Sequence, residues 1–159
     1  YNIPGRTGVN MLPSTVARLC GLQSIVGIKE GSGSVQQASE IANTCGDRMT
    51  VLAGDDALTL PMMAVGGKGV ISVTSNVVPS EMAQLVKAFL SGRIDEARRI
   101  HFALSPLFTA LFYETNPIPV KTALGMMGKI DPELRLPLCV MATETKALLT
   151  LVLKDAGLI

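Results

Sequence analysis

The residue best suited to chemistry in this sequence is Lys29, which ends the apolar run of the segment SIVGIKEGSG. Ile25, Val26 and Ile28 precede it, a pattern typical of a strand buried in a parallel sheet. A lysine at the end of such a strand can simply extend its amine to water. Burial, with room left by the small residues at 31–33, instead favours the free amine, which can attack a carbonyl carbon. Lys29 is therefore a candidate for forming an imine with a substrate.

Two further side chains could act beside this amine. Tyr1 stands at the end of a predicted strand, where its phenol could relay protons or could pack passively. Arg6 follows a Pro-Gly turn, so we expect it on a loop over the same edge of the sheet. Its planar guanidinium could bind a substrate carboxylate, or it could remain solvated. The predicted site thus combines a nucleophile, a proton relay and an anion-binding group.

The other polar positions are weaker candidates. Asp55 and Asp56 lack the third carboxylate or histidine that a metal site would need, so we predict that Asp56 caps a helix. His101 lies in a predicted helix, and no catalytic role is expected for it. The segment GGKGVIS lacks the residue order of a phosphate-binding loop; its glycines would rather let the backbone near Ile71 approach a ligand. No metal and no cofactor are predicted.

Composition argues against several classes of protein. The net charge is +1 without a basic block, so neither nucleic acid nor an anionic membrane is an expected partner. The apolar stretches at 102–113 and 147–153 are interrupted or too short to cross a bilayer. The three cysteines are odd in number and show no CxxC spacing, which indicates buried thiols in a reducing compartment. We therefore expect a cytoplasmic protein.

The elements that must position the site follow an alternating pattern, typical of βα units around a parallel sheet. The predicted strands are Tyr1–Ile3, Ile25–Lys29, Thr50–Ala53 and Val70–Thr74. Between and after them, helices are predicted at Pro13–Leu22, Val35–Cys45, Leu58–Val65 and Pro79–Leu90. Only helices are expected later, at Ile94–Leu111, Val120–Met127 and Glu144–Asp155. We predict an α/β fold, with four βα units in residues 1–92 and a helical region in residues 93–159.

Four units are half of what a closed barrel needs, since a TIM (β/α)8 barrel has eight strands and about 250 residues. Without partner strands, we expect Ile25, Val26, Ile28, Val70 and Ile71 to face water or an open edge. The first residue is Tyr1 at a strand end rather than an initiator Met, which favours a segment of a longer chain.

Several motifs in this order resemble one family. YNIPGRTG, VGIKEGSG, AGDD, GGKGVISVTSN and NPIPVK are similar to segments of the 4-hydroxy-tetrahydrodipicolinate synthases, also called dihydrodipicolinate synthases. The resemblance runs from Tyr1 to Ile159 and implies the C-terminal portion of that enzyme, from the fifth strand of the barrel onward. It implies a metal-free lyase of lysine and diaminopimelate biosynthesis. Lys29 would form a Schiff base with pyruvate, and the resulting enamine would condense with L-aspartate 4-semialdehyde.

The resemblance also implies roles and partners. Tyr1 matches the family's proton-relaying tyrosine, Arg6 the arginine that holds the semialdehyde carboxylate, and the backbone at Ile71 a contact to pyruvate. A homotetramer, built as a dimer of dimers, is implied, with the N-terminal half of the barrel supplying a threonine pair and a second tyrosine. Two alternatives stay open: a related pyruvate-dependent lyase that cleaves N-acetylneuraminate or keto-deoxy sugar acids, and a non-catalytic half-barrel fragment that binds a partner chain.

Overall fold

A parallel sheet of three short strands lies in the N-terminal part of the chain. The strands are neighbours in chain order: β1 (Gly27–Glu30), β2 (Thr50–Ala53) and β3 (Gly69–Val70). The segment before them extends the sheet at the edge of β1, where Asn2 forms a parallel bridge with Glu30. The chain is therefore α/β, with the parallel sheet that the alternating pattern predicts.

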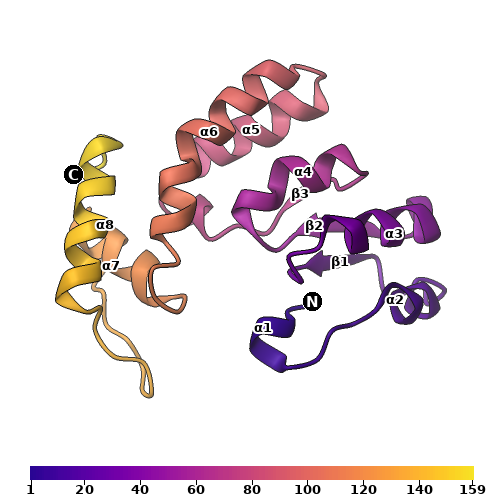
Figure 1. The fold of residues 1–159 in the computed structure, drawn as a ribbon, viewed down its shortest axis with the longest axis horizontal. Coiled ribbons are helices and arrows are strands. Elements are labelled where there is room, and N and C mark those ends of the chain that lie inside the picture. Colours follow the sequence, from indigo (N-terminus) through magenta and orange to yellow (C-terminus); the bar gives the residue numbers. More distant parts are fainter.

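The structure is a computed structural model that describes residues 1–159, and most of these residues lie in helices. The α-helices are α1 (Pro4–Thr7), α2 (Pro13–Leu19), α3 (Val35–Cys45), α4 (Thr59–Ala64), α5 (Pro79–Leu90), α6 (Ile94–Ala110), α7 (Ile118–Met126) and α8 (Thr143–Asp155). Short 3-10 turns form η1 (Gly46–Arg48), η2 (Asp56–Leu58) and η3 (Thr74–Asn76). Figure 1 shows an open arch, with α2 and α3 at one end and α7 and α8 at the other. None of these helices is both long and apolar enough to span a bilayer.

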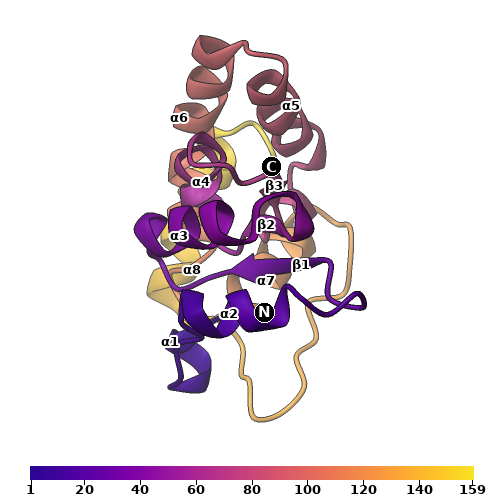
Figure 2. The same ribbon diagram turned by 90° about the vertical axis from the view of Figure 1, so that its right-hand side faces the viewer.

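One face of the sheet is covered by helices and the other is open. Ile28, Glu30 and Val51 point to the covered face and are buried. Figure 2 shows α3 and α4 stacked on one side of β1 and β2. Because side chains alternate along a strand, Lys29 and its partner in register, Leu52, point to the opposite face, where both are partly exposed.

Two buried apolar clusters make up the core. One cluster of 10 residues packs α2, α3 and α4 onto the sheet and has Ile41 fully buried within it. The other, of 16 residues, joins α5 to α8 and includes the fully buried Leu85 and Leu149. Val70 packs against both clusters, so it connects the sheet to the C-terminal helices. Residues 94–159 contain only helices and connecting segments, while the proposed division into two domains stays a prediction.

Helix α3 begins and ends at the predicted residues, and the local reasons are visible. The Ser34 hydroxyl accepts a hydrogen bond from the Gln37 N–H at 3.0 Å, which caps the helix. Gly46 ends it with a φ of 55°, in the left-handed region that glycine adopts most readily. Helix α5 also has the predicted bounds. Helices α6 and α8 each differ from the prediction by one residue at one end, and α4 is one residue shorter than predicted at both ends.

Other boundaries were predicted wrongly. β1 begins at Gly27 rather than Ile25, α2 ends at Leu19 rather than Leu22, and α1 was not predicted. β3 ends at Val70 rather than Thr74. The N–H group of Ile71 still bonds to β2, but those of Val73 and Thr74 donate to the Asp56 carboxylate instead of to a neighbouring strand.

The expected exposure of apolar strand residues is correct in part. The side chain of Val26 is 73% exposed and that of Ile71 is 46% exposed. Ile28, in contrast, is buried because it faces the helices, and Ile25 and Val70 are partly buried.

Candidate active site

A cavity of about 770 Å³ lies at the carboxyl ends of the strands. Its wall includes Tyr1, Arg6 and Lys29 from the N-terminal part of the chain. The facing wall is the segment 112–116, which connects α6 to α7. Parallel α/β folds gather their reactive groups at this edge of the sheet. The structure therefore brings together three of the four predicted site residues.

The amine of Lys29 packs on the ring of Tyr1. Its Nζ lies 4.2 Å from the ring centroid, which is a cation–π geometry. A Cβ at Gly31 would lie 3.0 Å from the Asn2 carbonyl oxygen and 3.2 Å from Cε2 of Tyr1, so only glycine leaves room for this approach. The expectation of open space at Gly31 is therefore wrong, since Tyr1 and Asn2 occupy it. The amine is not enclosed, because Tyr1 is 58% exposed and Lys29 is partly exposed.

A buried polar network fixes the end of β1 next to this lysine. The fully buried Glu30 accepts hydrogen bonds from the side-chain amides of Asn2 and Gln37, each at 3.1 Å. It also accepts one from the Ser32 N–H at 2.6 Å. Because the three donors come from the N-terminal segment, α3 and the loop after β1, the carboxylate holds these segments together. It thereby sets the position of Tyr1, the neighbour of Asn2.

Arg6 reaches across the cavity. It lies on the short helix α1 rather than on the expected open loop. Its Nη2 donates a hydrogen bond to the backbone carbonyl of Asn116 at 3.1 Å, across 110 positions of sequence. A guanidinium has five N–H donors, so this single bond leaves others free for a carboxylate ligand.

Asp56 is not the helix cap that the sequence predicts. Its neighbour Asp55 takes that role at η2, where it accepts a hydrogen bond from the Ala57 N–H at 2.9 Å. Oδ2 of Asp56 accepts from the backbone N–H groups of Val73 and Thr74, at 3.1 and 2.9 Å, and from the Thr74 hydroxyl at 2.9 Å. This buried carboxylate ties the end of β2 to the segment after β3, where Val73 lines the cavity.

Ile71, the fourth predicted site residue, is not in the wall of this cavity. Its N–H donates to the Ala53 carbonyl at 2.9 Å, which continues the ladder beyond β3. Lys29, Leu52 and Gly69 are partners in register across the three strands. Ile71 lies two residues after Gly69, and residues two apart in an extended segment face the same side, so Ile71 shares the open face of the sheet with Lys29. Its predicted contact with pyruvate stays a prediction.

Comparison with known proteins assigns the family. The model of the dihydrodipicolinate synthetase family matches residues 1–156. The chain belongs to this family. A curated relative, 4-hydroxy-tetrahydrodipicolinate synthase of Thermodesulfovibrio yellowstonii, is 57% identical over all 159 residues, which cover 55% of its length. The chain thus spans about half the length of the curated relatives that it matches.

Solved structures of the dihydrodipicolinate synthetase family match the fold. The dihydrodipicolinate synthase of Thermotoga maritima superposes with a TM-score of 0.97 at 46% identity, over 100% of this chain and 55% of its own. The chloride-inhibited enzyme of Acinetobacter baumannii, complexed with pyruvate, gives a TM-score of 0.96 at 39% identity, over 100% of this chain and 55% of its own.

Part of the cavity wall could not be predicted from the sequence. Gly54, Val73 and the segment 112–116 line it, and none of them had been given a role. The motif NPIPVK begins at Asn116, but only the fold reveals that the Asn116 carbonyl accepts a hydrogen bond from Arg6.

The remaining candidate groups lie outside the cavity. His101 packs against Phe102 and Phe108, and burial lowers its pKa. Cys20 and Cys45 are buried free thiols as predicted, whereas Cys139 is exposed because it lies in the connection between α7 and α8. Burial, reinforced by the neighbouring Cys20 thiol, raises the pKa of Cys45 to about 11. His, Cys, Asp and Glu side chains do not gather anywhere in groups of three that could hold a metal ion.

Proposed function

We propose that residues 1–159 form the second half of a (β/α)8 barrel. As part of the complete barrel, they would catalyse the condensation of pyruvate with L-aspartate 4-semialdehyde. The product is 4-hydroxy-tetrahydrodipicolinate, an intermediate of lysine and diaminopimelate biosynthesis. The observation that carries the proposal is the meeting of Lys29, Tyr1 and Arg6 in one cavity wall, in a chain of the dihydrodipicolinate synthetase family. The activity named for the relatives at 57% identity supports it.

In the first step, the free amine of Lys29 attacks the keto carbon of pyruvate. The carbinolamine loses its hydroxyl as water, for which a proton must be delivered, and an imine forms. The Tyr1 phenol is the candidate for this relay, because its ring centroid lies 4.2 Å from Nζ of Lys29. Loss of a methyl proton converts the imine to an enamine, the carbon nucleophile of the reaction.

In the second step, the enamine carbon attacks the aldehyde carbon of the semialdehyde. The substrate's own amine then attacks the imine carbon and closes the ring, and Lys29 leaves as the free amine. Arg6 would hold the carboxylate of the semialdehyde with the N–H groups that Asn116 does not occupy. The sum of these steps is one pyruvate and one semialdehyde converted to one product and one water. Ile71 would contact pyruvate from the same face of the sheet as Lys29.

The half-barrel proposal rests on the open side of the molecule. The side chain of Ile71 is 46% exposed on the face of the sheet that carries Lys29, and that face has no covering layer. The N-terminal half of the barrel would supply that layer. The tetramer and the cytoplasmic location implied by the resemblance stay predictions, which sedimentation and cell fractionation would test.

One experiment tests the chemistry. The complete barrel is incubated with pyruvate and borohydride, which reduces an imine to a stable amine, and the adduct is located by mass mapping. We expect a three-carbon adduct on Lys29. An adduct on Lys68 or Lys121 would contradict the assignment. If the enzyme cleaves N-acetylneuraminate and does not use the semialdehyde, the imine on Lys29 remains supported but the proposed substrate is wrong.

A further inference from the structure

Glu114 connects the wall of the cavity to the last helix of the chain. Its Oε1 accepts hydrogen bonds from the Ala142 N–H at 2.9 Å and from the Thr145 hydroxyl. Ala142 is the N-cap residue of α8 and offers no side-chain cap of its own. The first N–H groups of a helix lack partners within the helix and carry partial positive charge, so a carboxylate there is stabilising. Glu114 therefore acts as a cap supplied by a distant segment.

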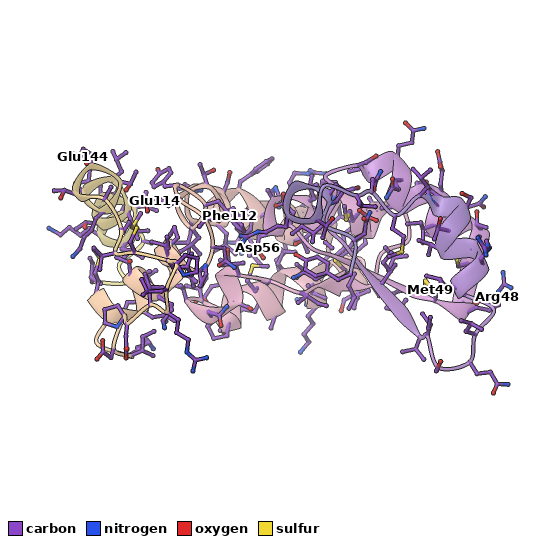
Figure 3. The ribbon with its side chains drawn as sticks, turned by 90° about the horizontal axis from the view of Figure 1, so that it is seen from below. Arg48, Met49, Asp56, Phe112, Glu114 and Glu144 are labelled. Atoms are coloured by element: carbon purple, nitrogen blue, oxygen red, sulfur yellow. The ribbon has the colours of Figure 1, made fainter.

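The same residue lies two positions from the partner of Arg6. The Asn116 carbonyl accepts the hydrogen bond from Nη2 of Arg6, and Glu114 and Asn116 both line the cavity. On its other side, this segment is fixed to the start of α7, where the Ile118 N–H donates to the Thr115 carbonyl at 3.0 Å. Figure 3 shows Glu114 beside the end of α8 that carries Glu144.

Arg6 needs such support, because it is exposed and stands on a helix of only four residues. A long side chain that is free in solution loses rotamer entropy when it binds a ligand. A guanidinium already held by a fixed carbonyl loses less of it, so the stability of the 112–116 segment bears on the affinity of the site for a carboxylate.

We infer that Glu114 is a positioning residue for the second substrate. By holding the segment 112–116 against the N-terminus of α8, it fixes the Asn116 carbonyl and thereby the orientation of Arg6. The helical region then contributes to the affinity for L-aspartate 4-semialdehyde although α8 does not touch the substrate. This inference rests on the proposed function. It predicts that loss of Glu114 weakens the binding of the semialdehyde and leaves the reaction with pyruvate unchanged.

The test measures steady-state kinetics of the complete barrel with both substrates. For Glu114→Ala we expect the KM for the semialdehyde to rise about tenfold, with kcat and pyruvate imine formation within about twofold of the parent enzyme. Glu114→Gln keeps a side-chain acceptor for the Ala142 N–H, so its KM should stay within about threefold. The matched control is Glu144→Ala, which removes an exposed carboxylate from the first turn of the same helix and should leave both KM values unchanged.

A double-mutant cycle separates positioning from general stabilisation. In an Arg6→Ala background, Glu114→Ala should raise the KM for the semialdehyde less than about twofold, because the group that it positions is gone. An equal rise in both backgrounds, or an equal rise for both substrates, would overturn the inference. If Glu114→Ala does not fold, Thr145→Val removes the hydroxyl donor and keeps Glu114, and it should show the same selectivity for the semialdehyde. A parent enzyme that does not turn over the semialdehyde would refute the proposed function itself, whereas an active parent with an unchanged KM in Glu114→Ala refutes only this inference.

Discussion

Lys29 and Glu30 are consecutive residues of β1 that face opposite sides of the sheet. Lys29 lines the cavity, while Glu30 is fully buried among three hydrogen-bond donors. The alternation of a strand thus places the proposed nucleophile and its structural support on two consecutive residues. The support is testable separately from the chemistry.

Glu30→Gln should destabilise the protein and disturb the cavity. The amide replaces one acceptor oxygen by an NH2 group, which would face the amide donors of Asn2 and Gln37. Loss of a buried, charged hydrogen-bond acceptor costs about 1.5–3 kcal/mol, so the free energy of unfolding of the complete barrel in urea should fall by about this amount. Glu40→Gln, on the exposed side of α3, is the control. A change below about 0.5 kcal/mol for Glu30→Gln would contradict the role given to the network.

Lys29→Arg should abolish turnover and leave the fold intact. The guanidinium keeps the positive charge beside the Tyr1 ring, but it stays protonated and cannot form an imine. We expect kcat to fall by at least about three orders of magnitude with an unchanged melting temperature. Lys68→Arg, at the opposite end of the strands, should retain activity. Substantial turnover by Lys29→Arg would exclude the imine mechanism.

Arg6→Ala should impair the use of the semialdehyde far more than the formation of the pyruvate imine. Loss of a charged hydrogen bond corresponds to about 1.5–3 kcal/mol, so kcat/KM for the semialdehyde should fall about 10-fold to 100-fold. Pyruvate imine formation, followed by borohydride trapping, should remain within about twofold. Arg18→Ala, on the exposed side of α2, serves as the matched control. Equal losses for both substrates would mean that Arg6 supports the cavity and does not bind the semialdehyde.

Gly31→Ala should slow the reaction through Tyr1. The added methyl would lie 3.2 Å from Cε2 of Tyr1 and 3.0 Å from the Asn2 carbonyl oxygen, so the aromatic ring must shift from its place beside Lys29. We expect a lower kcat and a slower rise of the imine in stopped-flow experiments with pyruvate. Gly21→Ala, whose methyl would meet its nearest atom at an ordinary 3.7 Å, is the control. Unchanged imine kinetics in Gly31→Ala would argue against a proton relay by Tyr1.

The cysteines should differ in reactivity with pH. The thiolate is the reactive form, and burial raises the pKa of Cys45 from 9.0 to about 11, so iodoacetamide at pH 8 should label the exposed Cys139 and spare Cys45. The unfolded thiol loses its proton at lower pH than the folded one, so the stabilising contribution is complete below pH 9 and is lost between pH 9 and about 11. Cys45→Ala should flatten the fall in stability across this range. Rapid labelling of Cys45 at pH 8 would contradict its burial.

The meeting of three candidate site residues in one cavity wall could be predicted because it depends on a simple rule of parallel sheets. Parallel strands bring their carboxyl ends to one edge, so Tyr1, Arg6 and Lys29 had to lie near one another once the strands were recognised. Helix α3 was predictable for a similar reason, since Ser34 and Gly46 mark its ends in the sequence itself.

The supporting residues could not be found by the same means. Glu30 and Asp56 are charged, and charged residues are usually exposed, so their residue type alone predicts contact with water. Strand alternation does place Glu30 on the face of the sheet opposite Lys29, which is the face that the helices cover. Asp56 and Glu114 act on partners that are 18 and 31 positions away, and no local periodicity encodes such pairs.

The hydrogen bond from Arg6 to Asn116 has a consequence for the order in which the protein forms. It joins positions 110 residues apart, so neither the helices at the start of the chain nor those at its end can complete the cavity alone. Contacts between residues so far apart in the sequence form late in folding, because closing a long loop costs conformational entropy before the contact stabilises the chain. During synthesis, which proceeds from the N-terminus at about 5–20 residues per second, Lys29 and Tyr1 would leave the ribosome several seconds before Asn116. The nascent chain would carry Lys29 without the facing wall of the cavity, which is complete only when the segment 112–116 has been translated and packed against Arg6.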